Sequence, residues 1–191
     1  VWVEYLRKIL DRFECRPETV LDLCCGTGSV AFRMAIQGYR MTGVDISAEM
    51  IDQAEKNATK LGMNVDFHVQ DASKLRLGRK FDLVVSLFDS LNYILDSSAL
   101  QEAFHRVSEH ISPGGLFVFD MNTELALADG LFDQSNKGSR AATLYDWKST
   151  YDPAARICRI NMDFVHRVGG EERRVSIVHY QRAYDLEEIV T

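Results

Sequence analysis

Short apolar runs alternate with segments of helical periodicity along the first two thirds of the chain. The apolar runs have the length of buried strands and are Val20–Leu23, Met41–Asp45, Val65–Val69, Phe81–Leu87 and Leu116–Phe119. Apolar residues three and four positions apart predict helices with the faces Leu6, Ile9, Leu10, Phe13, then Met50, Ile51, Ala54, Ala58, Leu61, and later Leu100, Ala103, Phe104, Val107, Ile111. Strands that alternate with helices predict an α/β fold with a doubly wound, mostly parallel, Rossmann-like sheet and helices on both faces.

Residues that start or stop helices support these boundaries. We expect Pro17 to close the first helix and a second helix to run from about Ser29 to Gln37, where Gly38 stops it. Ser47 is placed to cap the next helix at its N-terminus, and Gly62 ends that helix.

The last third of the chain has a different pattern. Three strand-like runs with partial alternation are Thr143–Asp152, Arg156–Val168 and Arg173–Ala183. Turn signals separate them at Asp152-Pro153 and at Gly169-Gly170. This pattern predicts an antiparallel β extension after the fifth strand. The residues after Tyr184 look like the opening of a helix, so we expect the chain to be truncated.

Composition narrows the class of protein. A length of 191 residues suits one domain, and the 46% hydrophobic and 26% charged content is that of a globular protein. The net charge of −6 argues against a nucleic-acid partner. No apolar run has the length of a membrane span, and no signal peptide is visible. The four cysteines lack metal-site spacing, so we expect no metal and reduced thiols in a cytoplasmic protein.

A glycine turn carries the chemistry. The strand that ends at Leu23 runs into Cys24-Cys25-Gly26-Thr27-Gly28, and the turn opens a helix. Glycines without a Cβ let a ligand approach the backbone, and the N–H groups of a helix start favour an anionic group. Asp45, at the end of the next strand, suits a ribose diol. These features predict a site for a nucleoside cofactor.

Asp22 decides between two cofactors. Gly26 to Ala31 also satisfies a loose dinucleotide pattern. A carboxylate at Asp22 would repel a pyrophosphate, whereas S-adenosylmethionine (SAM) brings an ammonium and a sulfonium instead. The charge pattern therefore favours SAM over NAD. The alternative is that Asp22 caps nearby backbone.

At this point the chain resembles the class I SAM-dependent methyltransferases. Their first motif stands here as Asp22-x-Cys24-x-Gly26-x-Gly28, with cysteine in the first glycine place. Further matches follow in order at Gly43–Met50, Phe67–Ala72, Phe81–Ser86 and Pro113–Asp120. The resemblance implies that SAM is bound by Asp22, Cys24, Gly26, Gly28, Asp45, Ile46, Met50, Asp71, Ala72 and Leu87. Asp71 would meet the adenine amino group.

The resemblance extends to a branch that methylates the amines of small molecules such as aminosugars. Phe88 to Tyr93 and Gln181 to Tyr184 carry this likeness. It implies one domain over 1–191, in which 1–122 form the SAM-binding core and 123–184 form a β extension that covers the substrate pocket. It also implies that the family's C-terminal strand pair is missing here.

Methyl transfer needs alignment of the nucleophile more than a fixed triad, so the catalytic group is open. The catalytic candidates are Asp89, Tyr93 and His179, and further residues that could hold a substrate are Asn92, Tyr145 and Trp147. We expect a SAM-dependent methyltransferase that acts on a small molecule such as an amine. Two alternatives remain, an NAD-dependent oxidoreductase and a protein that binds SAM without chemistry.

Overall fold

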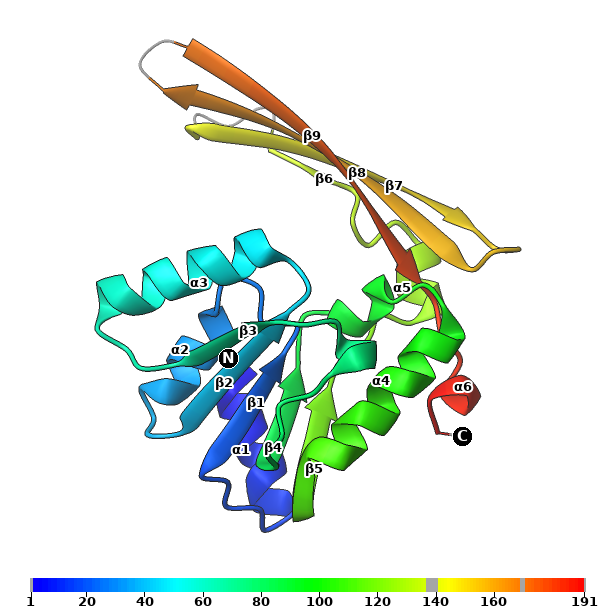
Figure 1. Ribbon diagram of the computed structural model, residues 1–191. Helices are drawn as coiled ribbons and strands as arrows, with labels where there is room; N and C mark the ends of the chain where they lie inside the picture. The colour runs from blue at the N-terminus through cyan, green and yellow to red at the C-terminus, as the bar shows by residue number, and fades with distance from the viewer. Residues whose placement is uncertain (1, 137–140, 169–170, 191) are drawn as a thin grey trace. The chain divides into compact units, whose positions relative to one another are not determined.

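The computed structural model describes residues 2–136, 141–168 and 171–190, and the chain divides into two compact units (Figure 1). The first unit comprises Val1–Leu91 and Ser98–Met121, and the second comprises Asn92–Ser97 and Asn122–Thr191. In the described part of the chain, no helix is long and apolar enough to cross a membrane.

The first unit is built on a five-stranded parallel sheet in the order β3-β2-β1-β4-β5. The strands are β1 (Thr19–Leu23), β2 (Arg40–Asp45), β3 (Asp66–Val69), β4 (Phe81–Ser86) and β5 (Ile111–Phe119). The chain winds outward from β1 to β3 and then crosses back to β4. The strand order therefore reverses between β1 and β4, and this is where open α/β sheets bind ligands. The predicted doubly wound sheet is confirmed.

Helices cover both faces of this sheet. The helices α1 (Trp2–Arg12), α2 (Ser29–Ala35) and α3 (Ala48–Leu61) share one apolar core with alternate strand residues, among them Leu116 and Val118 of β5. The intervening residues Phe117 and Phe119 point to the opposite face. There they pack against Phe104 of α4 (Ser97–His110), with ring centroids 5.8 and 5.3 Å apart. The alternation along β5 is the two-residue period of a strand that is covered on both sides.

Local capping sets α3 as predicted. The Ser47 hydroxyl accepts a hydrogen bond from the Met50 N–H at 3.2 Å, and Gly62 ends the helix with φ +64°. Ile51, Ala54 and Ala58 are buried, but Met50 and Leu61 are exposed, so the predicted apolar face is narrower than expected.

Two predictions at helix ends are wrong. The first helix ends at Arg12, well before Pro17, and Phe13 is 61% exposed instead of buried. Ile111 begins β5 instead of ending the helix before it. In both places the apolar period continues past the residue at which the backbone leaves the helix.

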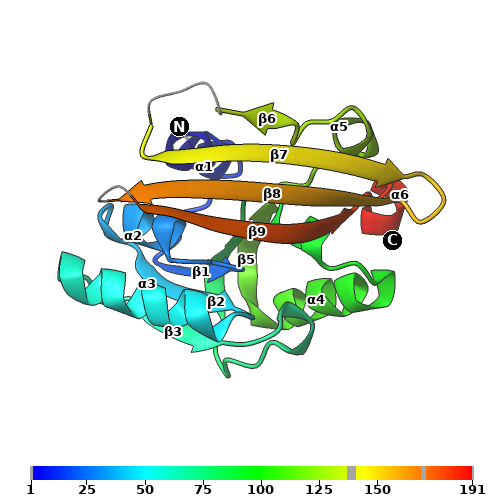
Figure 2. The ribbon, with the colours of Figure 1, turned by 90° about the horizontal axis from the view of Figure 1, so that it is seen from above.

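The second unit is an antiparallel sheet in the order β6-β7-β8-β9 (Figure 2). Its strands are β6 (Gln134–Ser135), β7 (Thr143–Asp152), β8 (Ile157–Val168) and β9 (Glu171–Arg182). The predicted antiparallel extension is confirmed, and the Asp152 carboxylate forms the first turn by accepting from the N–H groups of Ala154 and Ala155. The predicted turn at Gly169-Gly170 lies outside the described residues.

A core lies on one face of this sheet. Leu127 of α5 (Glu124–Ala128) is buried with Cys158, Ile160 and Met162 of β8. The short helix α6 (Leu186–Val190) follows β9. That residues 123–184 cover a substrate pocket stays a prediction.

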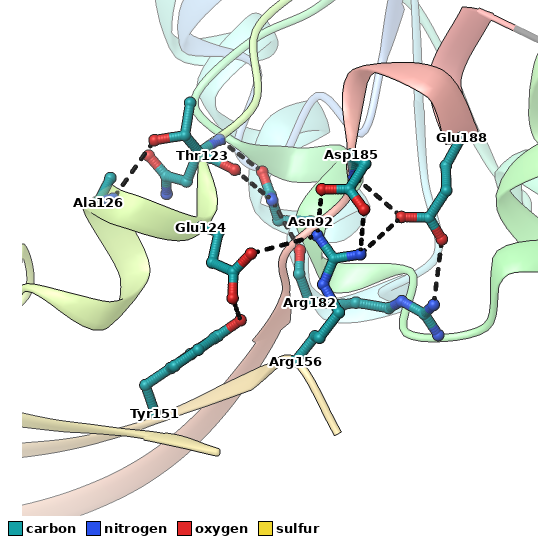
Figure 3. A network of polar contacts seen from close by, with 10 residues as sticks. Asn92, Thr123, Glu124, Ala126, Tyr151, Arg156, Arg182, Asp185 and Glu188 are labelled. Carbon is teal, nitrogen blue, oxygen red and sulfur yellow. Dashed lines mark hydrogen bonds and ion pairs between the residues drawn. The ribbon is translucent and has the colours of Figure 1, made fainter. Parts of the chain in front are cut away.

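A network of polar contacts joins residues of the second unit that are far apart in the sequence (Figure 3). The Arg156 guanidinium forms two hydrogen bonds of 2.6 and 2.7 Å with the Asp185 carboxylate and a third of 3.1 Å with Glu188. The Arg156 Nη2 atom, which also donates to Asp185, lies 3.5 Å from a carboxylate oxygen of Glu124. Glu124 in turn accepts from the Tyr151 hydroxyl at 2.8 Å. The network joins α5, the turn before β8 and the start of α6.

Candidate functional site

The turn after β1 has an unusual backbone. Cys24, Gly26 and Gly28 all have positive φ, at +62°, +53° and +84°. This region is costly for a residue with a Cβ, so Cys24 is held there by its surroundings. The Cys25 N–H donates to the Val44 carbonyl at 2.9 Å, which fixes the turn against β2.

The two glycines of the turn have different tasks. A Cβ on Gly26 would meet nothing within 4 Å, so its side of the turn is open to a ligand. A Cβ on Gly28 would lie 2.8 Å from the Phe32 ring and 3.0 Å from the Phe67 ring. Gly28 therefore lets α2 and β3 pack closely, and the close approach of a ligand belongs to Gly26.

Asp45 joins the turn to the end of β2. One carboxylate oxygen accepts from the Gly26 N–H at 2.8 Å, and the other accepts from the Ser47 N–H at 3.0 Å. Each carboxylate oxygen can accept more than one hydrogen bond, so the same group can also receive ribose hydroxyls.

Asp22 is buried at 2% exposure in β1. Its Oδ2 accepts from the Ala31 N–H at 3.1 Å, so the alternative of a backbone cap is present in the structure. Burial raises the pKa of Asp22 to about 7, the Ala31 hydrogen bond opposes this, and the charge of Asp45 adds to it. A cation placed nearby would favour the ionised form.

The pKa of the Cys24 thiol depends on burial and on the acidic groups near it. Burial, followed by the charges of Asp45 and Asp22 and a smaller effect of Asp71, raises the pKa of Cys24 to about 12. The thiol is therefore neutral at physiological pH and is a poor nucleophile. Cys24 is a free thiol, as are the other three cysteines.

Asp71 caps a short 3-10 helix, Ala72–Lys74, after β3. Its Oδ1 accepts from the N–H and the hydroxyl of Ser73 at 2.9 and 2.8 Å. Burial alone would raise the pKa of Asp71, but these hydrogen bonds outweigh it and the pKa is lowered. Asp71 therefore carries a charge at the end of β3.

The other predicted cofactor residues also follow strand ends. Ile46 and Met50 lie after β2, where they are 70% and 45% exposed. Ala72 follows β3 and Leu87 follows β4, and both are buried. The structure thus brings the predicted set to one edge of the sheet, while the contact of each residue with SAM stays a prediction.

The catalytic candidates divide between the two units. Asp89 belongs to the first unit and has φ +52°. Tyr93 and His179 belong to the second unit, where the Tyr93 hydroxyl lies 3.0 Å from His179 Nδ1. Tyr145 and Trp147 also pack together there, with ring centroids 5.8 Å apart.

Asn92 has a structural task. It is fully buried, and its amide donates to the carbonyls of Asn122 and Arg182 at 3.1 and 2.8 Å (Figure 3). Its carbonyl accepts from the Asn122 N–H at 2.8 Å. These bonds leave Asn92 little capacity for a substrate.

Sequence reasoning missed Asp120 at the end of β5. The backbone N–H groups of Asp89 and Phe88 donate to its carboxylate, whereas Oδ1 is buried with no hydrogen-bond partner among the described residues. Burial raises the pKa of Asp120 against the effect of those bonds. Its position directly after an apolar strand, one residue further on than that of Asp45 in β2, is the signal that could have identified it.

Within the described ranges, no cluster of three or more histidine, cysteine, aspartate or glutamate residues could hold a metal ion. The site consists of carboxylates around a glycine turn at the strand ends of a doubly wound sheet. An arrangement of this class binds a nucleoside ligand.

Comparison with known proteins identifies the family. A family model described as a methyltransferase domain matches residues 20–115. A solved S-adenosylmethionine-dependent methyltransferase from Clostridium acetobutylicum ATCC 824 is 30% identical, with a TM-score of 0.89, over 98% of this chain and 76% of that protein. The chain belongs to the SAM-dependent methyltransferases, as the resemblance predicted, and SAM is its cofactor.

Two further relatives match a shorter region. One is the dTDP-3-amino-3,4,6-trideoxy-alpha-D-glucopyranose N,N-dimethyltransferase of Streptomyces venezuelae, 32% identical over 53% of this chain and 41% of that protein. The other is the ubiquinone biosynthesis O-methyltransferase of Chelativorans sp. strain BNC1, 32% identical over 56% of this chain and 41% of that protein. These comparisons give no support to the NAD-dependent oxidoreductase alternative.

Proposed function

We propose that this methyltransferase transfers a methyl group from SAM to the amine nitrogen of a small molecule. The observation that carries the proposal is the convergence of carboxylates around the open side of Gly26. A surplus of negative charge suits a cationic cofactor and an amine acceptor. The Streptomyces venezuelae relative, whose name is that of an aminosugar N,N-dimethyltransferase, supports the same acceptor class.

Each residue of the predicted cofactor set receives a role. Asp45 binds the ribose hydroxyls, Asp71 meets the adenine amino group, and Asp22 answers the cationic groups. The open backbone at Gly26 makes room for the ligand, with Gly28 holding α2 in place. The remaining contacts come from Cys24, Ile46, Met50, Ala72 and Leu87.

When bound, SAM supplies an activated methyl group on a sulfonium centre. The protein's own task is to orient the acceptor and to exclude water, and such alignment lowers a barrier by roughly 7–11 kcal/mol. Asp89, Tyr93 and His179 are the residues proposed to position the acceptor. Residues 123–184 are proposed to cover the acceptor during the reaction.

The proposal includes a cytoplasmic location without nucleic-acid partners. Free thiols at Cys15, Cys24, Cys25 and Cys158 support a reducing compartment. The net charge of −6 disfavours binding to phosphate backbones.

Two measurements test this function. Calorimetry with SAM should give a stoichiometric complex that the Asp45→Ala variant weakens, with Asp52→Asn on the exposed face of α3 as a matched control. Labelled SAM should then transfer its methyl group to members of a primary-amine panel and not to matched alcohols. Methylation of alcohols alone would contradict the acceptor class, and SAM binding without any transfer would indicate a binding protein.

A further inference from the structure

We propose that a cavity between α1 and the ends of β4 and β5 receives the acceptor, and that Asp120 binds the acceptor's ammonium group and takes its proton. This inference rests on the proposed function and names the residue that selects amines. The cavity and Asp120 both belong to the first unit, so the argument needs that unit alone.

The cavity has the size and lining of a small-molecule site. It encloses about 510 Å³, within the range of ligand pockets. Its walls are mostly apolar and aromatic, and the lining residues are Trp2, Tyr5, Leu6, Ile9, Leu87, Val118, Phe119 and Asp120. Asp120 is the acidic residue among these described lining residues. Leu87 follows β4, and β4 pairs with β1, the strand that precedes the glycine turn.

The Asp120 carboxyl is held in place but not fully satisfied. The N–H groups of Asp89 and Phe88 donate to it, and both residues have left-handed backbone at φ +52° and +63°. Strained backbone of this kind is found where the surrounding structure needs a special geometry. At Phe88 and Asp89 this backbone directs both N–H groups toward the Asp120 carboxylate. Oδ1 is buried without a partner among the described residues, which costs free energy, while Asp120 as a whole is only partly buried and lines the cavity.

The aromatic rings of Trp2 and Tyr5 in the cavity wall suit the same cation. Trp2 meets Phe88 edge to face, with centroids 5.5 Å apart, and meets Tyr5 at 6.5 Å. Trp2 is 39% exposed and Tyr5 is 56% exposed, so both present ring surface to an incoming molecule. An ammonium group attracts ring faces as well as a carboxylate, and the two effects act together here.

The proton balance gives Asp120 its task. An amine enters as R–NH₃⁺ and must lose one proton to expose its lone pair, and the Asp120 carboxylate accepts that proton. Burial raises the pKa of Asp120, which makes its carboxylate a better base than an exposed one. The nitrogen lone pair then forms the new N–C bond while the C–S bond breaks and its electron pair stays on sulfur. Asp120 returns its proton to water, so the reaction releases one proton.

Trp2 lies in the cavity wall and provides the optical signal for the test. Benzylamine and its uncharged analogue benzyl alcohol would be titrated by tryptophan fluorescence at pH 7.5 into wild type and Asp120→Asn. Asp52→Asn serves as the matched control because Asp52 lies on the exposed face of α3. SAM binding would be measured separately by calorimetry on each protein.

We expect benzylamine to bind wild type at least tenfold more tightly than Asp120→Asn. Benzyl alcohol should bind both proteins alike, and SAM binding should change less than twofold. Equal benzylamine affinity in the two proteins, or no binding to wild type, overturns the inference. The Asp120→Glu variant keeps the charge and should regain part of the affinity for benzylamine. This result would show that Asp120→Asn loses affinity because the charge is missing and not because the protein fails to fold. Failure of wild type to bind SAM would contradict the proposed function while leaving the amine result interpretable.

Discussion

Replacing Gly28 with alanine tests how the glycine turn is built. The new Cβ would lie 2.8 Å from Phe32 Cε2 and 3.0 Å from Phe67 Cζ, at a backbone φ of +84°. Left-handed backbone costs a residue with a Cβ about 1–2 kcal/mol. Overpacking of a well-filled core adds about 1–3 kcal/mol. The two effects together predict a loss of about 2–5 kcal/mol in the free energy of unfolding for Gly28→Ala.

Gly26→Ala and Gly62→Ala are the matched controls. Both residues have left-handed φ, at +53° and +64°, but a Cβ at either would meet nothing within 4 Å. Each should therefore lose about 1–2 kcal/mol, the backbone cost alone. Denaturant unfolding of the three variants measures the difference, and calorimetry should show weaker SAM binding for Gly26→Ala but not for Gly62→Ala. The reasoning is refuted if Gly28→Ala is no less stable than Gly62→Ala.

Three more predictions follow. The pKa of Asp22 is raised from 3.8 to about 7, so its contribution to stability is present below pH 4 and is lost as the pH rises through 7, by at most about 4 kcal/mol. Asp22→Asn should remove this loss and melt above wild type at pH 8 but not at pH 4. Asp45→Ala should weaken SAM binding by about 1.5–3 kcal/mol in calorimetry, and unchanged affinity would remove Asp45 from the site. Arg156→Met should speed amide exchange in α6 and lower stability by about 1–2 kcal/mol, because its bonds to Asp185 and Glu188 are lost; equal exchange rates would contradict this.

The sheet of the first unit could be predicted because its signals are local. Apolar runs of strand length, the Ser47 cap and the Gly62 stop each act within a few residues, and the structure places these elements within a few residues of the prediction. Phe13 shows the limit. Its spacing fits the helix that precedes it, but the helix ends at Arg12 and Phe13 is exposed. The spacing of apolar residues within one helical turn does not show whether another part of the chain packs against them.

The site was predictable in its parts and not in its contacts. Asp22 and Asp45 stand out in the sequence because they are carboxylates in apolar strands, and Gly26 stands out because it lies in the turn after the first strand. That Asp45 accepts from the Gly26 N–H, or that Phe67 fills the space beside Gly28, depends on residues about 20 and 40 positions apart. Asp120 was missed for the same reason, since its cavity needs α1 from the opposite end of the first unit.

The charges at the strand ends explain why this turn suits SAM. Burial and, after it, the charges of three carboxylates raise the pKa of the Cys24 thiol. Burial also raises the pKa of Asp22, so ionisation of this carboxyl in the ligand-free protein is unfavourable. A ligand with an ammonium and a sulfonium reverses that cost, because each positive charge favours the ionised carboxylate. A pyrophosphate would add negative charge and increase the cost. We propose that the selectivity for SAM uses this unfavourable ionisation of Asp22, which a nearby cation relieves.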